Sequence, residues 1–506
     1  MALKRVGIVW SAVVALLLMG AAWSQNLDRV VVVQGTEVGD LDMSLRGGVV
    51  NLNPGLHLMD PLVNRDTDLN LIPWLATDWE WTDDSTLVMQ VREGVEFHDG
   101  SPLTADDVVF TFERIVNEGS VSNHNRYFNR NTVAETVADG DYTVIFRLTE
   151  PYAPFLTHLT AVGIASRAAV ERLGEERHRV EPVGTGPYVL TEWQPGVHIR
   201  MHANQSWWGG TPTIGELEWR TIAEGSTRTA EVLTGRADIV TGLPPSDVVR
   251  VEAAAGSAVM MVPSLRSIWL AFNTHKAPLE DVRVREAINL GVDMDGILEF
   301  ILEGMGQRIY GVVGPNVFGY KEGIEPIEYD PERARELLRE AGYPDGLTLN
   351  MNTREGRLLR DLEISEAIVA QLGAIGVNVQ LQLVDQERSL AIAASWTEDV
   401  DMYLTSNANL TADAHYNLGL NFYKPVRGVY WDHPELDRLI VEGLRSVDEQ
   451  ERLGIYAEAM ELIRREWPVL FMHNQQDIYG VSQRLSDAGW RPRSDEIINL
   501  VGLPRD

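Results

Sequence analysis

Residues 72–114 read IPWLATDWEWTDDSTLVMQVREGVEFHDGSPLTADDVVFTFER, and this stretch decides the fold. Leu87, Met89 and Val91 alternate with Val88, Gln90 and Arg92, and this period of two predicts a strand. The run FHDGSP (97–102) is typical of a turn, because glycine adopts positive φ and proline presets φ. Thr104 then offers an N-cap oxygen ahead of apolar residues at helical spacing, which predicts a helix beginning near residue 105. Nothing in this stretch indicates catalysis.

The same stretch carries the pattern P-x-LA-x-x-W, then D-x-x-T, then R-x-GV-x-FHDG-x-P-x-x-A-x-DV-x-F-x-x-x-R. This pattern resembles the large extracytoplasmic solute-binding proteins that serve peptide, opine and nickel ABC importers. The resemblance implies an α/β, two-lobed periplasmic-binding-protein fold. That fold is type II-like, with an extra subdomain in the first lobe and two hinge crossovers between the lobes.

Composition excludes several functions. The chain has 506 residues, no cysteine and a formal net charge of −31. Nucleic acids and anionic membranes bind positive surfaces, so neither is an expected partner. Without cysteine there are no disulfides, thiolate metal sites or cysteine nucleophiles.

The first residues have the three parts of a secretory signal peptide. Lys4 and Arg5 precede an uncharged run, 6–19, which is shorter than the ~20 residues that a membrane-spanning helix needs. Ala22 and Ser24 would permit cleavage before Gln25. We therefore expect a signal peptide at 1–24 and, because no cysteine is available for lipidation, a mature protein free in the periplasm.

Strand-like runs near 267–274 and 468–472 predict the two crossovers. Together with the family resemblance, these two crossovers predict a first lobe at 25–272, which includes an extra subdomain at about 56–183. A second lobe then covers 273–475, and the chain returns to the first lobe at 476–506. Within the second lobe, a strand at 347–352, a helix with an apolar face at 364–375 and an alternating strand at 377–384 predict a βαβ unit.

The first half of the expected ligand site follows the run Val30–Val33, which predicts a buried strand. In the resembled family the loop after this strand reaches the ligand cleft, so Thr36 and Glu37 are candidates. A solvated loop carboxylate is the alternative for Glu37. Trp207 and Trp208 are adjacent aromatics before Gly-Gly, and such a pair is more typical of packing than of ligand stacking.

The other half is expected at 396–423, a segment that loses periodicity and gains asparagine, threonine and aromatic residues. Trp396 and Trp269 are candidate walls, while Asn407, Asn409 and Asp413 are candidate polar contacts. Peptide-binding relatives place a carboxylate where this chain has Asn409, so peptides with a free amine are disfavoured. Arg357 and Arg360 are candidates for an anionic ligand group, because an arginine fork suits carboxylate or phosphate; ordinary surface charge is the alternative.

The chain carries no GxSxG, HExxH or GxxxxGK[ST] motif, and no residues select a cofactor or a metal. We therefore expect a monomeric, non-enzymatic receptor that takes a small polar ligand, an oligopeptide or an opine-like solute. It would deliver that ligand to an ABC permease and ATPase complex. A secreted hydrolase and a ligand-sensing or interaction protein of the same fold are the alternatives.

Overall fold

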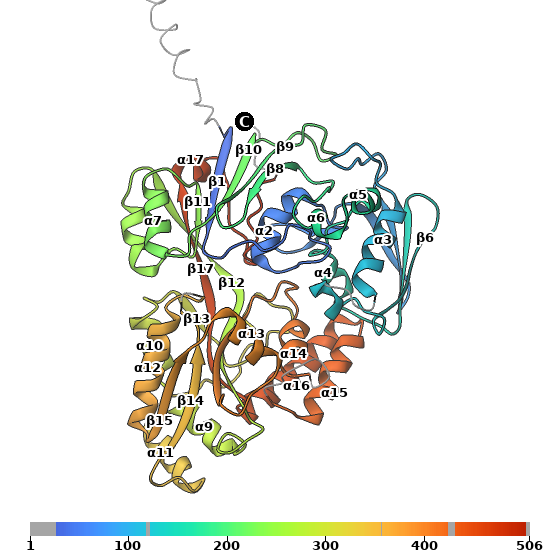
Figure 1. Cartoon of the computed structure of the whole chain (residues 1–506). Coiled ribbons are helices and arrows are strands. Elements are labelled where there is room, and N and C mark those ends of the chain that lie inside the picture. The colour runs from blue at the N-terminus through green and yellow to red at the C-terminus, as the bar shows by residue number, and fades with distance from the viewer. Residues whose placement is uncertain (1–26, 118–121, 356, 424–430, 502–506) are drawn as a thin grey trace, which may run out of the picture.

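The computed structural model describes residues 27–117, 122–355, 357–423 and 431–501. It has two α/β lobes joined by two long strands, β12 (Ser257–Phe272) and β17 (Val469–Ser482), which run from one lobe into the other (Figure 1). The predicted two-lobed fold is confirmed. The expected signal peptide lies outside the described residues. No helix of the described ranges is long and apolar enough to span a bilayer.

The first lobe is built on the buried strand that the valine run predicts, β1 (Arg29–Gln34). It pairs in parallel with β10 (Glu216–Thr221) and β11 (Ile239–Thr241). Beyond β10 the sheet continues through β9 (His198–Ala203) and β8 (Tyr188–Gln194), both antiparallel to their neighbours. Because the loop after β1 begins at the end of a buried central strand, its position beside the crossing strands is fixed.

The second lobe contains the expected βαβ unit. Strands β14 (Leu347–Thr353) and β15 (Val377–Leu383) pair in parallel, with α12 (Asp361–Ala374) between them in sequence. Strand β16 (Met402–Asn407) lies between β14 and β12. The short strand β13 (Gly306–Arg308) pairs with β17.

Hydrogen bonds between β12 and β17 join all of these strands into one eleven-stranded sheet across the described residues, with β13 pairing with β17 to one side of a ten-stranded path. The register of β12 against β17 shifts between Pro263 and Ser267 and again between Ile268 and Trp269. On either side of these irregularities the lobes have separate hydrophobic cores. The sheet thus runs through both lobes, whereas each lobe packs its side chains around a hydrophobic core of its own. The domain boundaries at 272 and 475 stay predictions.

A four-stranded antiparallel sheet forms the extra subdomain, in the order β4 (Ala76–Asp83), β5 (Thr86–Val91), β7 (Thr143–Leu148), β6 (Val133–Ala138). Helix α3 (Ala105–Val116) covers it, and Thr104 with Asp107 forms a capping box at its start. The strand, turn and helix predicted from 72–114 are therefore confirmed. A two-stranded ribbon, β2 (Val63–Arg65) and β3 (Leu71–Pro73), adjoins this sheet.

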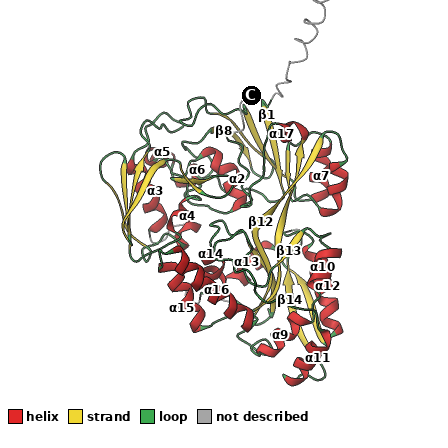
Figure 2. Cartoon of the chain, turned by 180° about the vertical axis from the view of Figure 1, so that it is seen from behind, coloured by secondary structure: helices red, strands yellow, loops and turns green. Residues whose placement is uncertain are grey.

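Short helices complete the first lobe and its subdomain: α2 (Val49–Leu58), η1 (Asn123–Arg126), α4 (Phe155–Leu159), α5 (Arg167–Leu173), α6 (Glu175–His178), α7 (Gly225–Leu233), η2 (Pro245–Asp247), α8 (Val248–Glu252) and α17 (Gln483–Asp487). The second lobe has α9 (Val282–Leu290), α10 (Met294–Phe300), α11 (Pro331–Glu340), α13 (Gln386–Ala394), α14 (Ala414–Asn421), α15 (Pro434–Arg445) and α16 (Glu449–Glu466). Helices α9–α12 lie along the sheet of this lobe, whereas α14–α16 lie beneath the subdomain (Figures 1 and 2).

The subdomain touches the second lobe directly, away from the crossing strands. The backbone N–H of Ala153 donates to the carbonyl of Leu444 at 2.9 Å, and Arg445 pairs with Glu150. The lobes are therefore in contact on two sides of the molecule, at the crossing strands and at the subdomain.

Candidate functional site

A cavity of about 170 Å³ lies where the crossing strands meet both lobes. The first lobe contributes the loop after β1, the start of α2 and the end of β11. The second lobe contributes Arg357, Leu358 and Leu359, just ahead of α12. The crossing strands supply Arg266 and residues 475–479, and the C-terminal segment supplies Glu496. We call this the hinge cavity.

Arg228 on α7 forms one wall and retains its charge. Its guanidinium donates to the carbonyls of Ile222, Ala223, Thr241 and Gly242 at 2.7–2.9 Å. No carboxylate of the described residues forms an ion pair with it. A Cβ at Gly35 would lie 3.1 Å from Arg228 Nη1, so glycine in the loop after β1 gives this arginine its space.

Arg266 and Glu496 form a nearly buried ion pair in the opposite wall. Arg266 Nε lies 2.8 Å from Glu496 Oε1, and Arg266 Nη2 lies 2.9 Å from Oε2. Asp477 on β17 is buried beside them, and burial together with Glu496 raises the pKa of Asp477 well above its usual range. One oxygen of Asp477 accepts from Gln475 at 2.8 Å, whereas its Oδ2 has no partner among the described residues.

Arg357 enters the cavity from the second lobe. Its backbone N–H donates to Asp361 at 2.8 Å, but its guanidinium makes no hydrogen bond or ion pair with any described residue. The side chain is exposed to the cavity. The Arg266 guanidinium, followed by desolvation, lowers the pKa of Arg357 to about 9, so the group stays a cation at neutral pH.

The charges around the hinge cavity do not cancel. Glu496 offsets Arg266, and the raised pKa of Asp477 leaves that acid as a weak counterion for the two remaining arginines, Arg228 and Arg357. In a protein with a net charge of −31 this is a local positive site. A cavity with these walls favours an anionic group on its occupant.

The sequence profile of the bacterial extracellular solute-binding proteins, family 5, matches residues 70–427. The chain belongs to this family. Among curated relatives, the glutathione-binding protein GsiB of Escherichia coli K12 is 26% identical over 481 residues, covering 92% of each chain. GsiB of Pectobacterium atrosepticum is 26% identical over 499 residues, covering 96% of each.

Solved structures agree with the family. The periplasmic binding protein DppA of Helicobacter pylori, in complex with peptide STSA, is 25% identical, with a TM-score of 0.81. That alignment covers 90% of this chain and 94% of DppA. AgaA with agropinic acid, at 23% identity and a TM-score of 0.79, covers 94% of this chain and 99% of its own, and shows the same fold. The predicted resemblance is thereby confirmed, and the protein is a solute-binding protein.

Of the nine site residues expected from sequence, two line the hinge cavity of this solute-binding protein: Thr36 and Arg357. Glu37 is exposed one residue further on, and it lines a separate shallow pocket beside Trp193 and Gly196. Arg360 pairs with Glu363 on its own helix at 2.8 Å, so its charge is already matched. The structure thus separates Arg357 from Arg360, which the sequence treats alike.

Three other candidates contact neighbouring residues of the second lobe and do not line the hinge cavity. Trp269 is fully buried in the second lobe's core, so it forms no wall of the cavity. Asn409 is also fully buried, and its amide donates to the carbonyl of Asp413 at 2.9 Å, bracing the turn before α14. Asp413 caps α14 through His415 N at 2.9 Å and pairs with Arg452 at 2.6 Å.

Trp396 and Asn407 are half-buried and neither lines the hinge cavity. Trp396 packs beside Val400 and Tyr403 of the second lobe, and Asn407 ends β16 opposite Ser267. Sequence reasoning missed Arg228, Arg266, Asp477 and Glu496. The signal for two of them was present, because Arg266 and Asp477 are charges inside otherwise apolar or strand-like runs.

Proposed function

We propose that the chain is the periplasmic receptor of an ABC importer and that the hinge cavity holds a carboxylate of its ligand. The observation that carries the proposal is the guanidinium of Arg357, which lacks any partner among the described residues. A planar guanidinium binds a carboxylate through two parallel hydrogen bonds. Peptides, glutathione and agropinic acid, the ligands in the relatives' names and titles, all carry carboxylates.

The cavity's size limits what enters it. An apolar cavity of roughly 150 Å³ holds one benzene, and the hinge cavity measures about 170 Å³. It therefore accommodates one group about as large as an amino acid. The rest of an oligopeptide or opine-like ligand would extend outward between the lobes.

Binding in this place couples to motion of the lobes. Thr36 belongs to the first lobe and Arg357 to the second, so a ligand that touches both stabilises the closed arrangement. The closed protein would then deliver its ligand to a membrane permease and its ATPase. The proposal also includes export, with cleavage of the signal peptide after Ser24 and no lipid anchor. The receptor would release its ligand chemically unchanged.

The test is calorimetric titration of the mature protein with glutathione, the dipeptide Met-Leu and an opine dicarboxylate. Arg357→Gln should weaken binding at least tenfold, because a charge-assisted bond contributes about 1.5–3 kcal/mol. Arg360→Gln is the matched control, since Arg360 is a neighbouring arginine already paired with Glu363. Equal effects of the two substitutions would contradict the placement.

The same samples discriminate the alternatives. Mass spectrometry of each ligand after incubation should find it intact, and a hydrolysis product would favour a secreted hydrolase. Saturable binding without stimulation of a reconstituted permease and ATPase would favour a sensing protein of the same fold.

A further inference from the structure

A second and larger cavity, of about 740 Å³, lies between the subdomain and the second lobe. We call it the outer cavity. The first lobe and its subdomain contribute Arg65, Trp81 and Tyr152, and the second lobe contributes Phe318 and Glu449. It shares no lining residue with the hinge cavity. Its volume lies within the range of about 300–1,000 Å³ that small-molecule sites occupy.

Apolar side chains cover much of the outer cavity. Trp81 and Phe318 are half-buried and come from opposite lobes. Val447, just ahead of α16, lines the same cavity and is exposed. These surfaces suit a ligand with an apolar body that contacts both lobes.

The rim of the outer cavity is negative. Asp68, Asp83, Asp84 and Glu449 are exposed there, and none forms an ion pair with a cation of the described residues. The two arginines of the wall are already engaged. Arg452 pairs with Asp413 at 2.6 Å, while Arg65 donates to the carbonyls of Leu69 and Thr411. The uncompensated charge is therefore anionic.

Tyr152 places a polar group, unpaired among the described residues, in the wall of the outer cavity. Tyr152 is only 4% exposed, and its ring lies against His158 and His415 at centroid distances of 5.6 and 6.2 Å. Its hydroxyl makes no hydrogen bond with any described residue although the side chain lines the cavity. Burial, followed by Asp413, raises the pKa of Tyr152, so the group is a neutral hydroxyl. The hydroxyl is therefore available to bond to a group that enters the cavity.

We propose that the outer cavity binds an organic amine, with the ammonium group at the carboxylate rim and an apolar body between Trp81 and Phe318. Tyr152 supplies the polar contact within the cavity. Because the walls come from both lobes, an amine bound there favours the closed arrangement independently of the ligand at Arg357. The solute-binding protein then has two sites of opposite charge preference.

Calorimetry with phenethylamine at physiological ionic strength tests this, because salt at that level screens non-specific attraction to an acidic protein. We expect saturable binding with a Kd below about 1 mM. The neutral analogue 2-phenylethanol has the same ring without the charge and should bind at least tenfold more weakly. Tyr152→Phe, which keeps the ring, should weaken phenethylamine binding about threefold.

The decisive comparison uses two double variants of equal net charge. Asp84→Asn with Glu449→Gln should weaken phenethylamine binding about fivefold, the effect expected for two exposed charge contacts. Glu252→Gln with Glu299→Gln removes two exposed acids elsewhere and should leave binding unchanged. Arg357→Gln should leave it unchanged as well. Equal affinities in the two double variants, equal binding of the neutral analogue, loss of binding in Arg357→Gln, or no saturation would each overturn the proposal.

Discussion

Three tryptophans and one threonine converge on a single buried carboxylate in the first lobe. Asp60 accepts hydrogen bonds from the indole N–H of Trp74 at 2.7 Å and of Trp208 at 2.9 Å. It also accepts from Trp207 at 3.3 Å and from the hydroxyl of Thr185 at 3.0 Å. Burial outweighs these donors and raises the pKa of Asp60 to about 6. The cluster ties the end of α2 to the segment after β9, so both segments depend on this acid.

Replacing Asp60 with asparagine should change how stability depends on pH. The wild-type carboxyl has a folded pKa near 6 and an unfolded pKa near 3.8. Its ionisation therefore destabilises the fold above pH 6, and this penalty is relieved as the pH falls and the folded state takes up a proton. Between pH 7 and pH 4.5 the loss of this penalty raises the free energy of unfolding by about 2 kcal/mol. The asparagine variant has no carboxyl to protonate and shows no such increase.

Urea denaturation at several pH values between 7 and 4.5, followed by far-UV circular dichroism, measures both proteins. The other titrating groups contribute equally to both proteins. The difference between the two free energies of unfolding therefore varies with pH only through Asp60. As the pH falls from 7 to 4.5, the free energy of unfolding of the wild type should rise by about 2 kcal/mol relative to that of the variant. A difference that does not vary with pH would show that burial leaves this pKa unshifted. A slope of opposite sign would show that the four donors outweigh desolvation.

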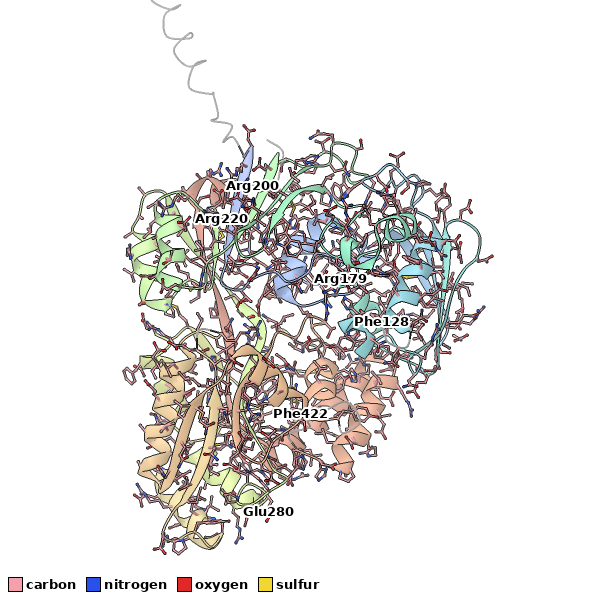
Figure 3. All side chains as sticks on the ribbon, viewed as in Figure 1. Phe128, Arg179, Arg200, Arg220, Glu280 and Phe422 are labelled. Carbon is pink, nitrogen blue, oxygen red and sulfur yellow. The ribbon has the colours of Figure 1, made fainter. Side chains whose placement is uncertain are left out.

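Two further predictions concern stability. Trp269→Ala should lower the free energy of unfolding by about 3–5 kcal/mol, as expected for a tryptophan lost from a core, while the folded variant binds ligand with unchanged affinity by calorimetry. Glu218→Gln should lower the free energy of unfolding by about 1–3 kcal/mol at pH 7, because Glu218 is buried between Arg29 and Arg200 on adjacent strands. Arg200 and Arg220, which both pair with Glu218, are labelled in the first lobe in Figure 3. Neighbouring arginines lower the pKa of the Glu218 carboxyl, so denaturation curves of wild type and variant should converge as the pH falls below the usual glutamate pKa of 4.5 and the folded protein takes up the proton.

The local elements were predictable because their signals lie within a few residues. Thr104 and Asp107 are three apart and form the capping box themselves, and the valines of β1 are buried as a run. The parallel pairing of β14 with β15 follows from a right-sized helix between them. The continuous path through β12 and β17 was not predictable in the same way, because its register shifts depend on contacts about two hundred residues apart in sequence.

The candidate site was harder to predict because a polar residue's role depends on partners that are distant in the sequence. Asp413 was expected to bind ligand, yet Arg452, 39 residues away on α16, already neutralises it. Arg266 and Glu496 pair across 230 residues, so neither draws attention alone. Arg357 and Arg360 are equal candidates from sequence, and only the structure distinguishes them, because Arg360 pairs with Glu363 one turn along α12.

The net charge of the chain does not predict which ligand charge each of the two inter-lobe cavities favours. A value of −31 favours cationic ligands everywhere if the charge is spread evenly. Instead, Arg228 and Arg357 in the walls of the hinge cavity form no ion pair with a carboxylate of the described residues, while the acids of the outer cavity stand exposed at its rim. Salt screens exposed charges beyond about 10 Å, so the arginines nearby govern the hinge cavity despite acids elsewhere, and a guanidinium–carboxylate contact adds two hydrogen bonds to the Coulomb attraction. The two sites should consequently respond differently to salt: added salt should weaken amine binding at the exposed rim more than carboxylate binding at Arg357.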